Sequence, residues 1–141
     1  PVSAVVARTE IMNTLGPGDD GSTFGGNPLA AAIGLAAIAL TQEDHLAEQA
    51  RVLGDYFMKE LKGIKTEMVK EVRGLGLFVG VELNKPFEAK EICRQLMKAG
   101  IITAAARRNV VRFTPSLTIT KSEIESALER IDVILRTEIK G

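Results

Sequence analysis

The chain has 141 residues, enough for one domain with a hydrophobic core. Hydrophobic residues make up 45% and charged residues 26%, as in an ordinary globular protein, and the formal net charge is zero. A neutral chain argues against a nucleic-acid partner or an anionic membrane surface, because both usually select a basic surface.

The first 41 residues contain three predicted elements. The Val- and Ala-rich run at residues 2–7 predicts a short buried strand, and residues 16–26, rich in Gly, Pro and Asp, predict a loop. Asn27 is a good helix cap and Pro28 suits the first helical position, so a helix should begin there and run through Leu40. This helix is apolar on every face, which is typical of a buried helix, and it is too short to span a bilayer, so no membrane partner is expected.

A second helix is predicted from Glu43 to Lys62, ending at Gly63. Its apolar stripe, which repeats about every 3.6 residues, consists of Leu46, Ala50, Leu53, Phe57 and Leu61. The period then changes to two, which predicts a strand over residues 77–83. Residues 68–72 should form its neighbour, connected through Gly74 and Gly76.

The remaining chain predicts a helix over residues 86–99 that ends at Gly100, and strands at residues 101–104 and 110–114. Thr120 and Glu123 have the spacing of a capping box, so a last helix should begin there. Its core-facing side chains are predicted to be Ile124, Ala127, Leu128, Ile131 and Leu135. Ile92 and Leu96 should point inward from the preceding helix.

This order of elements predicts an α/β chain whose residues 42–141 form a small α+β domain, with helices covering a sheet. Residues 1–41 contain a strand, a loop and an apolar helix that needs a cover. We interpret them as the remnant of a larger domain. A first residue of proline, without a methionine, also favours a fragment of a longer protein.

The loop and helix start at residues 21–28, Gly-Ser-Thr-Phe-Gly-Gly-Asn-Pro, suit a phosphate group. Glycines let the backbone approach closely and expose N–H groups, Ser22 and Thr23 add hydroxyl donors, and a helix N-terminus follows. On composition alone, the commoner explanation is a Gly-rich connector that leads into a capped helix.

The same stretch resembles the signature of class III aminotransferases, and is matched best by the ornithine and acetylornithine aminotransferases. Residues 72–77, Val-Arg-Gly-Leu-Gly-Leu, and residues 111–115, Val-Arg-Phe-Thr-Pro, resemble two further segments of that family, and residues 1–5 resemble its strand after the cofactor lysine. The segments agree in order and spacing, so the resemblance covers essentially the whole chain.

The resemblance implies the C-terminal small domain of a fold-type I transferase that uses pyridoxal 5'-phosphate, with residues 1–41 as a remnant of the large cofactor-binding domain. Thr23, with Ser22 beside it, would bind the phosphate of a cofactor held by the other subunit of a homodimer. Arg112 would pair with a carboxylate of an amino-acid or 2-oxo-acid substrate, since a guanidinium matches a carboxylate bidentately. Without the resemblance, Arg112 is a solvated arginine on a strand whose neighbours, Val111 and Phe113, face the core.

The implied activity is transfer of the δ-amino group of ornithine, or of acetylornithine, to 2-oxoglutarate. The family's Schiff-base lysine lies a few residues before the strand that opens this chain, so we assign no catalytic residue and expect the chain alone to be inactive. The alternative is a non-catalytic remnant that acts as a binding or oligomerisation module. The sequence also departs from the family pattern at Asp20, where histidine is common, and over residues 104–109.

Other candidate sites have simpler explanations. One cysteine, Cys93, excludes an internal disulfide and suits a buried inert thiol in a cytoplasmic protein, and one histidine, His45, does not make a zinc site, so no metal is expected. His45 should be solvated or partly capping.

The Gly74–Gly76 pair lacks the third glycine and the following helix of a dinucleotide loop. Arg107 and Arg108 should form an exposed turn, and Lys59, Lys62, Lys65 and Lys70 should be solvated.

Overall fold

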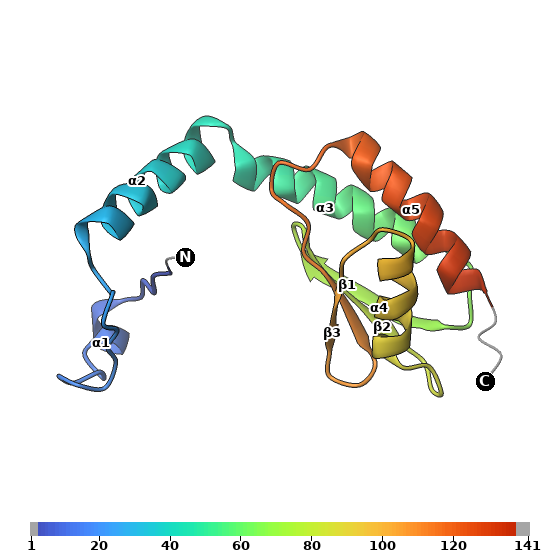
Figure 1. Cartoon of the computed structure of the whole chain (residues 1–141), viewed down its shortest axis with the longest axis horizontal. Coiled ribbons are helices and arrows are strands. Elements are labelled where there is room, and N and C mark those ends of the chain that lie inside the picture. The colour runs from blue at the N-terminus through green and yellow to red at the C-terminus, as the bar shows by residue number, and fades with distance from the viewer. Residues whose placement is uncertain (1–2, 138–141) are drawn as a thin grey trace. The chain divides into compact units, whose positions relative to one another are not determined.

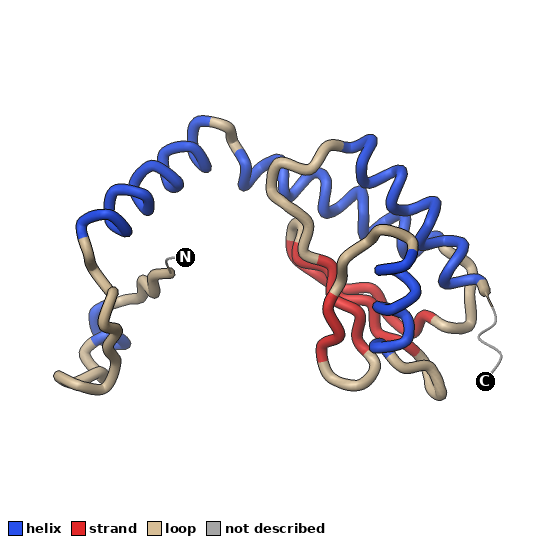
Figure 2. The backbone as a smooth tube through the Cα atoms, in the orientation of Figure 1, coloured by secondary structure: helices blue, strands red, loops and turns tan. Residues whose placement is uncertain are grey.

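The structure is a computed structural model that describes residues 3–137. The chain divides into two compact units, Pro1–Asp44 and His45–Gly141, and each is described by itself. Every strand within the described residues belongs to the second unit (Figure 2).

The first unit contains a short helix, α1 (Thr9–Met12), and a long helix, α2 (Pro28–Glu43). The predicted strand at residues 2–7 is wrong over its described part, because residues 3–7 are exposed and form no regular structure; Val2 lies outside the described residues. A strand needs a hydrogen-bonded neighbour, and the described residues of this unit provide none. The predicted loop over residues 16–26 is confirmed, while α1 had no sequence prediction.

Helix α2 begins where its cap predicts. The Asn27 side chain accepts a hydrogen bond from the Ala30 N–H at 2.9 Å, and Pro28 occupies the first helical position. The helix continues past the predicted end at Leu40 to Glu43, since no helix-breaking residue intervenes. It stops before His45, which adopts a left-handed conformation with φ 51°, so the next helix begins at Leu46 rather than at Glu43.

The predicted burial of α2 is wrong for the described chain. None of its side chains is buried, because no other apolar element of its unit covers it. The large apolar side chains that it exposes are Leu29, Ile33, Leu35, Ile38 and Leu40.

The second unit opens with α3 (Leu46–Gly63), whose predicted stripe is confirmed from Ala50 to Leu61, while Leu46 is only half-buried. Ala50, Phe57 and Leu61 are buried, and Leu53 packs against them. Strands β1 (Val69–Leu75) and β2 (Phe78–Leu83) follow as the predicted hairpin, closed by a turn in which Gly76 has φ 53°. A non-glycine residue rarely adopts such a φ, so the turn depends on Gly76.

Helix α4 (Ala89–Lys98) begins later than predicted. A turn precedes it, because the Phe87 N–H donates to the Asn84 carbonyl, and the Ala89 N–H donates to the carbonyl of Arg108. Ile92 and Leu96 are buried as predicted. Gly100 follows with φ 81°, as a helix-ending glycine should.

Strands β3 (Ala104–Ala106) and β4 (Val110–Phe113) complete an antiparallel sheet with the order β1-β2-β4-β3. The predicted strand at residues 101–104 is wrong in its bounds, because pairing with β4 selects Ala104 opposite Arg112 and Ala106 opposite Val110. Helix α5 (Lys121–Arg136) then begins with the predicted capping box of Thr120 and Glu123.

The core of the second unit lies between the sheet and helices α3, α4 and α5 (Figure 1). Alternate strand residues enter this core from one face of the sheet, and they are Val79, Val81, Leu83, Val111 and Phe113. The intervening residues therefore lie on the opposite face. Arg112 is one of them, so the fold places it on the face that the core does not use.

Candidate functional site

The candidate phosphate loop, residues 21–28, is held by short-range hydrogen bonds. The Gly25 N–H donates to the Ser22 carbonyl at 3.1 Å, and the Asn27 side-chain amide donates to the Phe24 carbonyl at 2.5 Å. Gly26 adopts φ 70°, which favours glycine at this bend. The loop therefore has a defined shape that its own sequence maintains.

Ser22 and Thr23 lie at the exposed part of this loop. Their hydroxyl and backbone N–H groups make no hydrogen bond to residues 3–137, so these donors face solvent. Free hydroxyl and amide donors on a glycine-rich turn are what a phosphate group needs. The residues present thus fit the phosphate of pyridoxal 5'-phosphate.

Asp20 lies beside this loop, at the position where the family that the sequence resembles often has histidine. Its carboxylate accepts a hydrogen bond from the Gly21 N–H at 2.9 Å. The carboxylate therefore engages the start of the loop and takes one backbone donor, while the donors of Ser22 and Thr23 stay available.

Arg112 lies on β4 with its side chain exposed, and its neighbours Val111 and Phe113 are buried, as predicted. The guanidinium carbon of Arg112 lies over the ring of Phe78, 5.8 Å from the ring centroid. Gly80 is the residue directly opposite Arg112 on β2. Within the described residues, Arg112 forms no ion pair with a carboxylate.

A charged cluster occupies the neighbouring part of the same sheet. Glu82 accepts hydrogen bonds from Lys70 at 2.7 Å and from Arg73 at 2.8 Å, and Arg73 also bonds Glu71 at 2.7 Å. The hydrogen bonds from Lys70 and Arg73 hold the pKa of the Glu82 carboxyl below its usual value. These acids are therefore engaged by cations other than Arg112.

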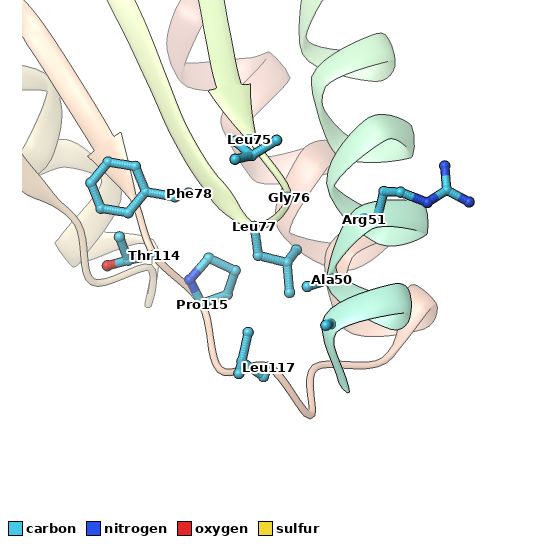
Figure 3. A pocket seen from close by; sticks show the side chains of 10 residues that line it. Ala50, Arg51, Leu75, Gly76, Leu77, Phe78, Thr114, Pro115 and Leu117 are labelled. Atoms are coloured by element: carbon cyan, nitrogen blue, oxygen red, sulfur yellow. The ribbon is translucent and has the colours of Figure 1, made fainter. Parts of the chain in front are cut away.

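An open apolar cavity of about 440 Å³ lies at the turn between β1 and β2 (Figure 3). Leu75, Leu77, Pro115 and Leu117 contribute apolar side chains to its lining. Arg51 also lines it, but its guanidinium points away from the opening, where it pairs with Glu48 at 2.6 Å. Phe78 belongs to both this lining and the contact with Arg112, so the cavity adjoins the candidate carboxylate site.

The other candidate residues carry no chemistry in the structure. His45 is exposed and makes no side-chain cap, and Arg107 and Arg108 form the predicted exposed turn. Cys93 is half-buried against the core rather than buried. Lys70, predicted to be solvated, is exposed but paired with Glu82. Residues 3–137 hold no cluster of metal-binding side chains and no helix that is long and apolar enough to cross a membrane.

The sequence-predicted site residues fall in different units, Ser22 and Thr23 in the first and Arg112 in the second. Sequence reasoning missed Phe78 as the neighbour of Arg112. The alternation in residues 77–83 places Phe78 and Gly80 on one face, but only the pairing of β2 with β4 brings that face to Arg112.

The sequence matches known proteins over nearly its whole length. The family Aminotransferase class-III matches residues 1–135. An ornithine aminotransferase from Staphylococcus carnosus is 50% identical over 131 residues, which are 93% of this chain and 33% of that protein. The ornithine aminotransferase of Bacillus subtilis is 41% identical over 96% of this chain and 33% of its own length. The chain therefore spans about a third of the length of these curated relatives.

Solved structures agree with the sequence matches. A structure of Plasmodium falciparum ornithine delta-aminotransferase superposes with a TM-score of 0.81 at 37% identity, covering 92% of this chain and 35% of that one. An acetylornithine aminotransferase from Elizabethkingia anophelis gives a TM-score of 0.78 at 34% identity over the same shares. The expected fold, part of a pyridoxal-phosphate-dependent transferase, is confirmed. The chain belongs to the class III aminotransferase family.

Proposed function

We propose that this chain is the C-terminal part of an aminotransferase that moves the δ-amino group of ornithine, or of acetylornithine, to 2-oxoglutarate. The observation that carries the proposal is the exposed loop at Ser22 and Thr23, whose donors are unused within residues 3–137. The names and identities of the relatives support ornithine as the donor.

In this proposal, residues 1–41 belong to the large cofactor-binding domain and residues 42–141 to the small domain. Ser22 and Thr23 donate hydrogen bonds to the phosphate of pyridoxal 5'-phosphate, which the other subunit of a homodimer holds. When bound, this cofactor supplies an electron sink that stabilises a carbanion next to the transferred nitrogen. The lysine that holds the cofactor would come from the part of the relatives' length that this chain does not span.

Arg112 binds a substrate carboxylate in this proposal. A guanidinium presents planar N–H donors to the two carboxylate oxygens, and a charge-assisted hydrogen bond contributes about 1.5–3 kcal/mol. Arg112 forms no ion pair with a carboxylate in the described chain, which supports this role. We also propose a cytoplasmic location, with small amino acids and 2-oxo acids as the partners.

The test uses the protein that contains these residues, at its natural length, with ornithine and 2-oxoglutarate. Amino transfer should give glutamate and the aldehyde at C5 of the former ornithine. Thr23→Val should weaken cofactor binding, measured by cofactor absorbance, and Arg112→Lys should raise KM for the carboxylate substrate. Failure to transfer an amino group from ornithine and acetylornithine would overturn the proposal.

A second candidate is a non-catalytic module that binds a partner or oligomerises, and the exposed apolar side chains of α2 favour it. Five large apolar side chains of one helix are more than half exposed, and such a surface usually marks an interface. Under this candidate the 141-residue chain should form a dimer or a larger species, measured by light scattering. A monomer at micromolar concentration would count against it.

A further inference from the structure

We propose that Phe78 is a positioning residue for Arg112, which it holds across the open face of the sheet with the N–H donors free for a substrate carboxylate. The inference rests on the role proposed for Arg112 and extends it to a residue on another strand. Three observations support it: the ring contact, the strand register and the placement of the nearby acids.

The contact itself is the first observation. The guanidinium carbon of Arg112 lies 5.8 Å from the centroid of the Phe78 ring, within the range of a cation–π interaction. Within residues 3–137 the guanidinium of Arg112 forms no ion pair, so the ring contact leaves its N–H donors free for a carboxylate.

The register of β2 and β4 explains why the two side chains meet. Gly80 lies directly opposite Arg112, and Phe78 lies two residues earlier on the same face of β2. A diagonal neighbour is within reach of an aromatic or long side chain. Gly80 has no side chain, and Ala104, which lies opposite Arg112 on β3, has only a methyl group, so neither directly opposite residue competes for the guanidinium.

The nearby acids are held by other cations. Glu82, on the same face of β2, bonds Lys70 and Arg73, and Glu71 bonds Arg73. Arg112 is thus left with an aromatic partner on a face that also carries carboxylates. Phe78 is 60% exposed within the described chain, so the described residues leave the contact open.

The kinetic test uses the protein at its natural length and compares Phe78→Leu with Phe78→Tyr. Phe78→Leu should raise KM for 2-oxoglutarate about two- to fivefold, the range that an exposed cation–π contact is worth, with a smaller change in kcat. Phe78→Tyr should leave KM for 2-oxoglutarate close to that of the unchanged protein, because a phenol ring keeps the attraction for a cation. In an Arg112→Lys background, Phe78→Leu should add less than it does alone.

A second measurement does not depend on activity. In the 15N-labelled 141-residue chain, the side-chain Nε–H signal of Arg112 should show an aromatic ring-current shift that Phe78→Leu removes and Phe78→Tyr retains. Leu117→Ala, in the lining of the adjoining cavity, is the matched control and should leave the signal unchanged.

The two measurements separate the inference from the proposed function. If the protein shows no amino transfer but the ring-current shift is present, the proposed function fails while the contact stands. If amino transfer occurs and Phe78→Leu changes neither KM nor the Nε–H signal, the positioning role is overturned. An equal loss of kcat in the Leu and Tyr variants would also overturn it, because that pattern indicates a purely structural role.

Discussion

The two units of this chain use apolar residues in opposite ways. Helix α3 has a narrow apolar stripe and buries Ala50, Phe57 and Leu61 against the sheet. Helix α2 is apolar on all sides and buries nothing within the described chain. Apolar content therefore does not determine burial. Burial requires another element that packs against the apolar side chains, and within the described residues only the second unit contains such elements.

The comparison teaches where the stability of the chain resides. The second unit has a core formed by three helices and one face of the sheet, whereas the first unit relies on local hydrogen bonds and helix caps. We therefore expect one substitution to have different effects in the two units, and the following experiments exploit that difference.

The largest effect is expected in the core. Ile92 is fully buried, so Ile92→Ala should lower the free energy of unfolding by about 2–5 kcal/mol, through lost transfer energy and a cavity. The measurement is urea denaturation of the 141-residue chain. The matched variant Ile38→Ala lies on exposed α2 and should change the free energy by less than about 0.5 kcal/mol. Equal losses would show that α2 is covered after all.

The next effect concerns two helical glycines. A methyl group at Gly54 on α3 would lie 2.1 Å from the carbonyl oxygen of Gly76, so Gly54→Ala must displace the hairpin turn. Such overpacking should cost about 1–3 kcal/mol. Gly34 on α2 has open space around it, and Gly34→Ala should instead stabilise the helix by about 0.5–1 kcal/mol. Thermal unfolding and helical circular dichroism measure both, and a loss at Gly34 would contradict the comparison.

The helix caps should give a smaller difference. Thr120→Ala removes the capping box of α5, and Asn27→Ala removes the cap of α2; each should cost about 0.5–2 kcal/mol locally. Loss of the Thr120 cap should lower the unfolding midpoint of the second unit. Loss of the Asn27 cap should appear mainly as faster amide hydrogen exchange at the start of α2, because no core there links the helix to global unfolding. Thr120→Ser, which can still cap, is the control.

The smallest effect is a pH dependence of the second unit. Lys70 and Arg73 lower the pKa of Glu82 in the folded chain, so the Glu82 contribution is present above the usual carboxyl pKa, 4.5. It is lost as the pH falls through the lower folded pKa. The stability difference between the chain and Glu82→Gln should therefore be larger at pH 7 than at pH 3, measured by urea denaturation. A difference that grows toward pH 3 would contradict the assignment.

The sequence predicted the helices more accurately than it predicted strand pairing and burial. The caps at Asn27 and Thr120 and the stripe of α3 gave correct helices, because each depends on residues close in sequence. The strand at residues 2–7, the bounds of β3 and the burial of α2 could not be predicted, because they depend on partners distant in the chain or outside it. The phosphate loop could be recognised as a motif in the sequence. The contact between Phe78 and Arg112 depends on the pairing of β2 with β4, which could not be predicted from the sequence.

The self-capped start of α2 has a consequence for ligand recognition. Asn27 satisfies the Ala30 N–H, and Pro28 has no N–H to satisfy, so these two positions of the first turn need no anion. A phosphate arriving at Ser22 and Thr23 would then meet a loop already shaped by its neighbours. Little ordering entropy would be lost on binding, so loop variants that keep the Asn27 cap should alter affinity without melting the helix.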